Sequence, residues 1–245
     1  MIFRTAARLI WFLFDVAFAF INYTFTAARA PQSTKRLARA NWLHRSCIGN
    51  LKVYNCQASV TGPVPAAGLL ISNHLSYLDI LVLSSITPAV FVSKSEVRHW
   101  PVCGWLAALG GTVFIERNRR MDVGPVNEEI VAALADGALV VIFPEGTSTN
   151  GEQLLPFRSS LLEPATLGSP PVAICYLSYE IDDGDPRHEI CYWGGHTFLP
   201  HAIKLMGKKT IRAKVRFGTF QRTATNRKDL ALELHEAVQK LKSAG

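Results

Sequence analysis

The hydrophobic and polar positions of this chain alternate between two patterns from about residue 51 onward. Short apolar runs are typical of buried strands. They occur at residues 68–72, 90–92, 111–115, 138–143, 171–176, 189–193 and 210–217. Helical periodicity occurs at residues 78–83, 121–136, in the 160s and at 227–243. This alternation predicts an α/β domain over residues 51–245, in which helices flank a mixed, largely parallel sheet.

The first 50 residues differ from this pattern and predict an N-terminal membrane-associating helical segment. Residues 9–25 are apolar and aromatic almost throughout. Residues 31–50 predict a second helix, which Ser33 or Thr34 would cap and Gly49 would end. The basic side chains of this second helix suit an anionic bilayer surface, or form an ordinary solvated face.

The sequence leaves open how residues 9–25 meet the membrane. These 17 residues are at the short limit for a span, and Asp15 at their centre would cost roughly 2.5–3.5 kcal/mol in a bilayer. Basic residues flank both sides, so the positive-inside rule gives no orientation. We favour a helix in the membrane interface or a shallow anchor, formed by residues 1–30 at the cytoplasmic face, over a full span. A helix packed on the domain core is the remaining alternative.

The charge balance narrows the range of partners. The 245 residues carry a net charge of +7, with a pI of about 9.3, which suits nucleic acid, anionic lipid or a phosphorylated substrate. No basic stripe interleaved with aromatic residues and no DNA-binding motif is present, so we expect no nucleic-acid partner. The five cysteines show no C-x-x-C spacing and no zinc-type cluster, which fits reduced residues at a cytosolic face.

The clearest candidate for catalysis is the turn between the strand at 68–72 and the helix from residue 78. His74 would take a proton from a hydroxyl, and Asp79 would fix its tautomer and stabilise the imidazolium. Five helical positions rotate through about 500°, so the two side chains meet only if His74 precedes the helix and Asp79 lies in its first turn. Ser76 as N-cap would allow this. Ser76 and Asp79 also fit a capping box with a purely structural role.

Three more stretches bring polar or pocket-forming residues to strand ends. Arg117 follows the run at 111–115 and offers a bidentate donor for a phosphate or carboxylate. Residues 143–149 follow the most apolar strand with a carboxylate, a glycine and three hydroxyls, and Arg158 adds a guanidinium nearby. Residues 171–174 are apolar and would form a pocket wall. Each stretch alone also fits an ordinary ion pair, polar loop or core strand.

Four motifs together carry a more specific signal. They are Asn73-His74-x-x-x-x-Asp79, Gly111-x-x-Phe114-Ile115-x-Arg117, Phe143-Pro144-Glu145-Gly146-Thr147 and Pro171-x-x-Ile174, in that order. With these motifs the chain strongly resembles the glycerolipid acyltransferase family, in particular the bacterial 1-acyl-sn-glycerol-3-phosphate acyltransferase type. The resemblance covers about residues 73–174, and the preceding basic, membrane-associating helices also look like that family's N-terminal region.

The resemblance implies a direct acyl transfer. His74 would deprotonate the acceptor hydroxyl, Asp79 would orient His74, and the hydroxyl oxygen would attack the thioester of an acyl donor without an acyl-enzyme. The donor would be acyl-CoA or acyl-carrier protein, and no metal or other cofactor would be needed. The acceptor would be a membrane lysophospholipid, 1-acyl-glycerol-3-phosphate, which gives phosphatidic acid.

The resemblance also implies roles for the remaining motif residues. Arg117 would hold the phosphate of the acceptor. The other residues expected to bind the acceptor are Glu145, Gly146, Thr147, Ser148 and Arg158. Pro171 and Ile174 would line the acyl or donor path.

Two departures from the family pattern leave the acceptor open. Ser148 stands where many members have Arg, and residues 157–160 end in Ser where many have Gly. Related enzymes that complete ornithine-type aminolipids look similar here, so a lyso-aminolipid is an alternative acceptor.

Two other classes of protein also stay open: a hydrolase that activates water with His74 and Asp79, and a non-catalytic lipid-binding protein. No G-x-S-x-G elbow is present, which disfavours a covalent hydrolase, and the intact pair argues against a non-catalytic role.

Overall fold

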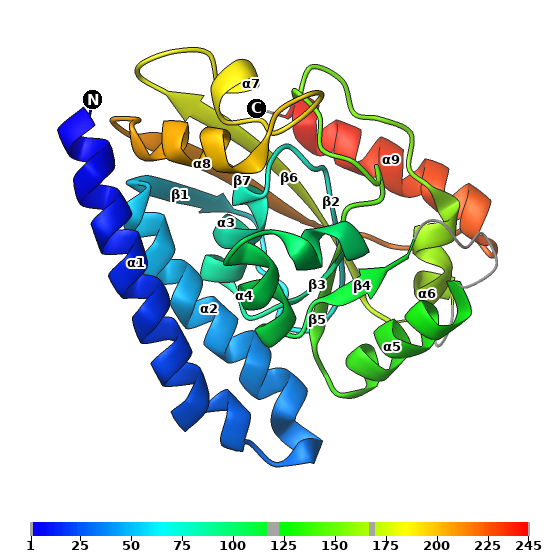
Figure 1. The fold of residues 1–245 in the computed structure, drawn as a ribbon. Coiled ribbons are helices and arrows are strands. Elements are labelled where there is room, and N and C mark those ends of the chain that lie inside the picture. Colours follow the sequence, from blue (N-terminus) through cyan, green and yellow to red (C-terminus); the bar gives the residue numbers. More distant parts are fainter. Residues whose placement is uncertain (1, 117–122, 167–169, 245) are drawn as a thin grey trace.

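A computed structural model describes residues 2–116, 123–166 and 170–244 of the chain (Figure 1). Their strands form one seven-stranded sheet in the order β1-β7-β6-β2-β5-β3-β4. The strands are β1 (Cys56–Thr61), β2 (Gly68–Ser72), β3 (Val90–Lys94), β4 (Val113–Ile115), β5 (Leu139–Ile142), β6 (Val172–Ile181) and β7 (Ile211–Thr219). The α-helices are α1 (Ile2–Phe25), α2 (Lys35–Val53), α3 (Leu78–Ile86), α4 (Cys103–Leu109), α5 (Val123–Ala135), α6 (Glu163–Thr166), α7 (Pro186–Glu189), α8 (Phe198–Met206) and α9 (Arg227–Ser243). Short 3-10 turns are η1 (Ala27–Arg29), η2 (Gln32–Thr34), η3 (Ser95–His99) and η4 (Ser159–Leu162).

Most neighbouring strands of the sheet run parallel. β6, β2, β5, β3 and β4 are parallel neighbours in that order, β1 is parallel to β7, and β6 and β7 form an antiparallel pair. Every position of β2 and β5 is buried, as expected for parallel strands that helices cover on both faces. The predicted α/β fold with a mixed, largely parallel sheet is confirmed. The carboxyl ends of β2, β5, β3 and β4 share one edge, where the candidate residues follow.

The strand predicted at residues 189–193 is wrong. Residues Pro186–Glu189 form α7 instead, and the chain continues from there without a strand. Asp185 starts this helix, because its Oδ1 accepts the N–H of Arg187 at 2.9 Å and Pro186 occupies the first helical turn. Helices α4 and α8 were not predicted from the sequence.

Gly49 does not end the second helix, contrary to the prediction. Helix α2 continues to Val53, and Thr34 occupies the N-cap position without a capping hydrogen bond from its side chain. A Cβ atom on Gly49 would lie 2.4 Å from Oδ1 of Asp15 on α1. The neighbouring Asn50 donates from Nδ2 to Oδ2 of Asp15 at 2.6 Å. The glycine therefore allows the two helices to approach closely around this polar pair.

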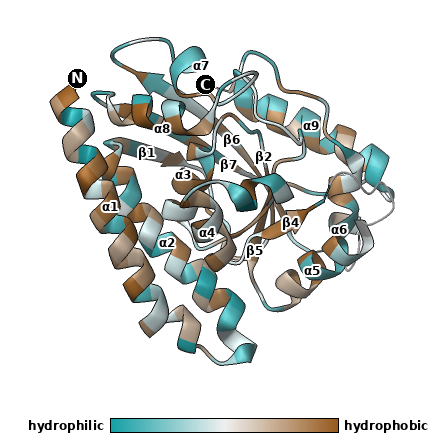
Figure 2. Cartoon of the chain, viewed as in Figure 1, coloured by the Kyte–Doolittle hydropathy of each residue, from teal (hydrophilic) through white to brown (hydrophobic). Residues whose placement is uncertain are grey.

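Helix α1 presents its apolar side to the outside and its charged side chains to the protein. Figure 2 shows it as hydrophobic along most of its length. Its exposed large apolar residues are Ile2, Phe3, Leu9, Ile10, Trp11, Leu13, Phe14, Phe18, Ile21 and Phe25. Arg8 points inward and donates to the carbonyl of Met206 at 3.0 Å, and Asp15 bonds to α2. Ile2–Arg29 is long and apolar enough to cross a membrane, so α1 indicates membrane association.

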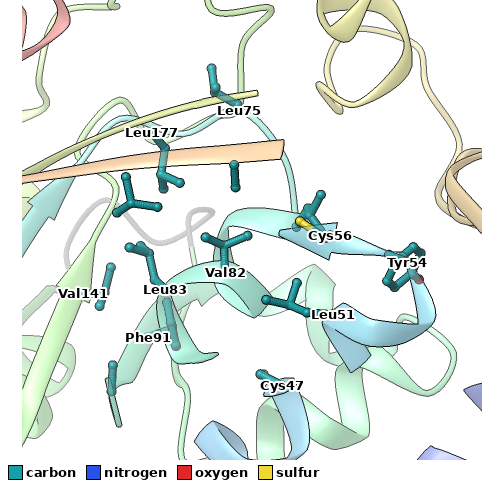
Figure 3. Packing of buried hydrophobic residues seen from close by; sticks show 14 of the residues in the cluster. Cys47, Leu51, Tyr54, Cys56, Leu75, Val82, Leu83, Phe91, Val141 and Leu177 are labelled. Carbon is teal, nitrogen blue, oxygen red and sulfur yellow. The ribbon is translucent and has the colours of Figure 1, made fainter. Parts of the chain in front are cut away.

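The hydrophobic core lies on both faces of the sheet. Helices α2 and α3 cover one face, where Leu51 and Leu83 pack in the same cluster as Leu177 of β6 (Figure 3). Helices α5 and α9 cover the other face. Trp42 of α2 is fully buried, and its Nε1 donates to the carbonyl of Ala19 in α1 at 2.8 Å. Thus α1 and α2 share a core with the sheet, and α2 continues past residue 50, the predicted domain boundary.

Candidate active site

Asn73 marks the point where the chain leaves the sheet after β2. Its side-chain amide donates to the carbonyl of Leu177 at 2.9 Å and accepts the N–H of Leu177 at 2.7 Å. The side chain therefore continues the ladder between β2 and β6 in place of the main chain. Because the ladder is completed in this way, the main chain is free to turn away, and His74 lies just beyond the strand end.

His74 and Asp79 form a hydrogen-bonded pair. Nδ1 of His74 lies 2.8 Å from Oδ2 of Asp79, and the same oxygen accepts the N–H groups of Leu75 at 2.7 Å and Ser76 at 3.0 Å. The other oxygen accepts the hydroxyl of Tyr179 at 2.7 Å. Asp79 is fully buried, and these four donors compensate for the burial of its carboxylate. A carboxylate at Nδ1 holds the proton there and leaves Nε2 free to accept one.

The two sequence interpretations of Asp79 apply together. Ser76 is not the N-cap of α3 as predicted: Tyr77 occupies that position, and the Ser76 hydroxyl is buried without a hydrogen-bond partner. One half of the capping box does form, because Asp79 accepts the Ser76 N–H. A single carboxylate thus closes the first turn of α3 and orients His74. As the spacing required, His74 precedes the helix and Asp79 lies in its first turn.

The loop after β5 holds the backbone of His74. Oε1 of Glu145 accepts the N–H of His74 at 2.8 Å, and Oε2 accepts the N–H of Leu155 at 2.9 Å. The N–H of Thr149 donates to the carbonyl of His74 at 3.0 Å. Glu145 is buried, which raises the pKa of its carboxyl group, while the N–H donors of Leu155 and His74 lower it. The net direction is a raised pKa.

Two further features of this loop shape the surroundings of His74. The ring of Phe143 stacks on the imidazole of His74, with centroids 4.2 Å apart and an angle of 17° between the planes. Gly146 has a φ of +70°, a conformation that glycine adopts without strain. The hydroxyl of Ser148 donates to the carbonyl of Tyr192. This hydroxyl therefore ties the loop to the segment before α8.

A cavity of about 620 Å³ lies beside His74. Most of its lining side chains are apolar. The lining extends from Phe12 of α1 and Leu43 of α2 to Glu116 after β4 and Arg158 before η4. The side chain of His74 is 20% exposed, so its ring can reach a molecule in this cavity.

The structure brings some of the predicted site residues to this cavity and not others. His74, Gly146, Thr147, Ser148 and Arg158 line it. Glu145 is absent from the lining, as are Pro171 and Ile174. Pro171 lies where β6 begins, since its carbonyl accepts the N–H of Leu69 in β2, and Ile174 packs in the core on the α5–α9 face. Arg117 lies outside the described residues.

Sequence reasoning missed one wall of the cavity, which aromatic residues form. Tyr77, Trp100 and Tyr192 line it, and their rings pack edge to face at centroid distances of 5.5 to 6.4 Å. The hydroxyl of Tyr77 lies 3.0 Å from Nδ1 of His201. Burial and the neighbouring His196 lower the pKa of His201 to about 4. The three rings of this wall come from three separate segments of the chain, so no local sequence pattern predicts it.

The chemistry of this arrangement is proton abstraction beside an apolar cavity. Among the residues that the structure describes, no group of three or more His, Cys, Asp or Glu side chains is placed to hold a metal. The pair of His74 and Asp79 provides a base with a fixed tautomer, and the cavity provides room for a long apolar substrate.

Comparison with known proteins agrees with this chemistry. A family model described as "Acyltransferase" matches residues 54–178. The lyso-ornithine lipid O-acyltransferase of Rhizobium meliloti is 36% identical over 190 residues, which cover 71% of this chain and 65% of that protein. The enzyme of the same name from Brucella abortus is 36% identical over 187 residues, which cover 71% of this chain and 70% of that protein.

Two further comparisons concern proteins named for a phosphorylated acceptor. The 1-acyl-sn-glycerol-3-phosphate acyltransferase of Neisseria gonorrhoeae is 34% identical over 154 residues, which cover 62% of this chain and 60% of that protein. The chain thus spans slightly less than two thirds of the Rhizobium and Neisseria proteins. The crystal structure of the 1-acyl-sn-glycerophosphate acyltransferase PlsC from Thermotoga maritima shares the fold, with a TM-score of 0.63 and 16% identity over 97% of this chain and 95% of that one.

Proposed function

The chain belongs to the acyltransferase family whose model matches residues 54–178, and on that premise we propose that it transfers a fatty acyl group from a thioester donor to the hydroxyl of a lyso-lipid. The observation that carries the proposal is the buried, fully hydrogen-bonded Asp79 behind His74, at the side of a mostly apolar cavity. A hydroxyl is a weak nucleophile and needs such a base near neutral pH.

The proposed reaction uses the side chains of His74 and Asp79. Nε2 of His74 accepts the proton of the lyso-lipid hydroxyl while the hydroxyl oxygen attacks the thioester carbonyl carbon. The tetrahedral intermediate collapses, the carbon–sulfur bond breaks, and the thiolate takes the proton from the imidazolium. Asp79 stabilises the imidazolium between these two steps. The products are an ester and a thiol, with no covalent bond to the protein, and the step uses no metal or other cofactor.

The donor would be acyl-CoA or acyl-carrier protein, as expected from the motifs. Both are anionic thioesters, and a net charge of +7 favours their approach. The acceptor is a membrane lipid, so the cavity must be reached from the bilayer surface. Helix α1 supports this, because its outer face is apolar and its Phe12 lines the cavity. We place the reaction at the cytoplasmic face, where the thioester donors are.

Two acceptors fit the site, and they differ in the head group. The motifs favour 1-acyl-glycerol-3-phosphate, with phosphatidic acid as the product. Two observations favour a lyso-ornithine lipid. Ser148 stands where many family members have arginine, and its hydroxyl donates to the carbonyl of Tyr192. The cavity lining carries Glu116 together with Lys94 and Arg158. An ornithine head group has one ammonium and one carboxylate, which an acidic and a basic side chain would match. The names of the Rhizobium and Brucella relatives agree, so we place the lyso-ornithine lipid first.

The test is an assay of the purified full chain in mixed micelles. Acyl-CoA and acyl-carrier protein are each offered with lyso-ornithine lipid, lysophosphatidic acid or no acceptor. We expect a diacyl ornithine lipid as the main product. Transfer only to lysophosphatidic acid would support the phosphorylated acceptor instead, while thioester cleavage that is equally fast without any acceptor would identify a hydrolase.

A further inference from the structure

We propose that Glu145 is a positioning residue, which fixes the backbone of His74, and that it does not bind the acceptor. The proposal rests on the proposed function in one respect, namely that His74 is the catalytic base. The motif resemblance assigned Glu145 to acceptor binding together with Gly146 and Thr147. The geometry separates Glu145 from these two neighbours.

Both carboxylate oxygens of Glu145 already have protein partners. Oε1 accepts the N–H of His74 at 2.8 Å and Oε2 accepts the N–H of Leu155 at 2.9 Å. The residue is 2% exposed and does not line the cavity, whereas Gly146, Thr147 and Ser148 do. An acceptor molecule in the cavity therefore meets the three following residues and not this carboxylate.

The loop that contains Glu145 contacts His74 at three places. The carboxylate of Glu145 accepts the N–H of His74, and the N–H of Thr149 donates to the His74 carbonyl at 3.0 Å. The ring of Phe143 stacks on the imidazole. Gly146, with φ of +70°, forms the turn between Glu145 and the cavity-lining residues Thr147 and Ser148. The same loop thus supports His74 and lines the cavity, and Phe143 does both, whereas Glu145 only supports His74.

Two carboxylates consequently hold His74 from different directions. Asp79 holds Nδ1 of the ring, and Glu145 holds the backbone N–H, each at 2.8 Å. If the Glu145 carboxylate were removed, the N–H of His74 would have no hydrogen-bond partner in a largely buried turn. A glutamine at this position keeps the size of the side chain. Its carbonyl oxygen accepts one N–H, but its NH₂ group faces the other as a second donor, so one of the two bonds is lost.

The first experiment separates positioning from binding by steady-state kinetics. For Glu145→Gln we expect kcat to fall by about 10- to 100-fold, with the acceptor KM changed by less than about twofold, because the base is misaligned and the cavity is intact. Arg158→Gln, a cavity-lining variant, is expected to raise the acceptor KM instead. A raised acceptor KM with an unchanged kcat in Glu145→Gln would overturn the proposal.

The second experiment needs no activity, and its first part uses the wild-type protein alone. Hydrogen exchange of the wild-type full chain in micelles, resolved to single residues, should show the amides of His74 and Leu155 as strongly protected. In Glu145→Gln, the low-field proton resonance of Nδ1–H on His74 should shift or broaden. Rapid exchange of the His74 amide in the wild type would refute the backbone contact. If the wild type transfers no acyl group, the proposed function fails while this measurement still decides the role of Glu145.

Discussion

The hydroxyl of Tyr179 donates a 2.7 Å hydrogen bond to Oδ1 of Asp79, although the two residues lie 100 positions apart. Tyr179 comes from β6 and Asp79 from the first turn of α3. Because His74 and two backbone N–H groups occupy the other oxygen, the tyrosine fixes the remaining side of the carboxylate. The orientation of Asp79, and through it that of His74, therefore depends on a strand that contributes nothing to the cavity lining at this position.

Removing this hydroxyl should lower the rate more than it lowers stability. For Tyr179→Phe we expect kcat to fall by about tenfold and the free energy of unfolding by about 1 kcal/mol, because one bond to a buried carboxylate is lost. Kinetics and chemical denaturation in micelles measure the two effects. Tyr176→Phe is the control, since Tyr176 lies on the same strand and packs in the cluster on the opposite face of the sheet. Equal rate losses in both variants would contradict the role of Tyr179.

The proposed role of His74 as the catalytic base is tested by His74→Ala. Acyl transfer should fall by at least about 100-fold while the protein stays folded and membrane-bound, since general-base catalysis typically contributes 10²- to 10⁴-fold. His188→Ala, at an exposed position on α7, should retain full activity. More than about a hundredth of wild-type activity in His74→Ala would mean that another group takes the proton.

His201 should make the protein less stable in acid. Its pKa is lowered to about 4, first by burial and then by His196, and its Nε2 is buried without a hydrogen-bond partner. The folded chain therefore holds His201 neutral, whereas the unfolded chain binds a proton below about pH 6.5, so stability falls as the pH drops from 6.5 toward 4. Between pH 7 and pH 5 we expect this residue to account for about 1–2 kcal/mol.

The control for this pH effect is His201→Gln, which keeps a polar partner for the Tyr77 hydroxyl but does not titrate. Denaturation curves of both proteins at pH 7 and pH 5 provide the comparison. The variant should lose less stability over this range than the wild type. An identical loss would assign the acid sensitivity to other groups.

Gly49→Ala tests the close contact between α1 and α2. The added Cβ would meet Oδ1 of Asp15 at 2.4 Å, so Asp15 must move and its bond to Asn50 must lengthen or break. We expect a loss of about 1–2 kcal/mol in the free energy of unfolding. Gly124→Ala in α5 is the matched control, because nothing lies within 4 Å of its added Cβ. That variant should be unchanged or slightly more stable.

Membrane binding should depend on the outer face of α1. Phe14 and Phe18 are 72% and 67% exposed, and burying a phenylalanine in an apolar phase contributes about 1.5–3 kcal/mol. The double variant Phe14→Glu and Phe18→Glu should therefore bind vesicles of phosphatidylethanolamine and phosphatidylglycerol at least about tenfold more weakly. Leu232→Glu on α9, where the leucine is 66% exposed, is the control and should bind normally. Unchanged binding of the double variant in flotation assays would place the membrane contact elsewhere.

Local signals in the sequence were sufficient to predict the contact between His74 and Asp79 and most strands of the sheet. The strand Gly68–Ser72 and the helix Arg227–Ser243 have the predicted limits, because continuous burial and amphipathic periodicity are properties of neighbouring residues. The meeting of His74 and Asp79 also follows from local spacing, once a helix begins between them.

Contacts between distant segments were not predictable in this way. Tyr179 has no local feature that marks it as the partner of Asp79. Gly49 fits a helix end by sequence, and only the position of Asp15 on another helix shows why a glycine is needed there. For Glu145 the sequence gives a carboxylate in a polar loop, but the side toward which it points depends on the turn at Gly146.

Phe12 lines the cavity from the helix whose outer face is apolar. If the outer face of α1 lies against the bilayer as proposed, this helix forms part of the wall between the cavity and the lipid. Lateral pressure in the bilayer would act directly on this wall, so we expect the turnover rate to vary with membrane fluidity. An acyltransferase built in this way would adjust its rate to the physical state of the bilayer itself.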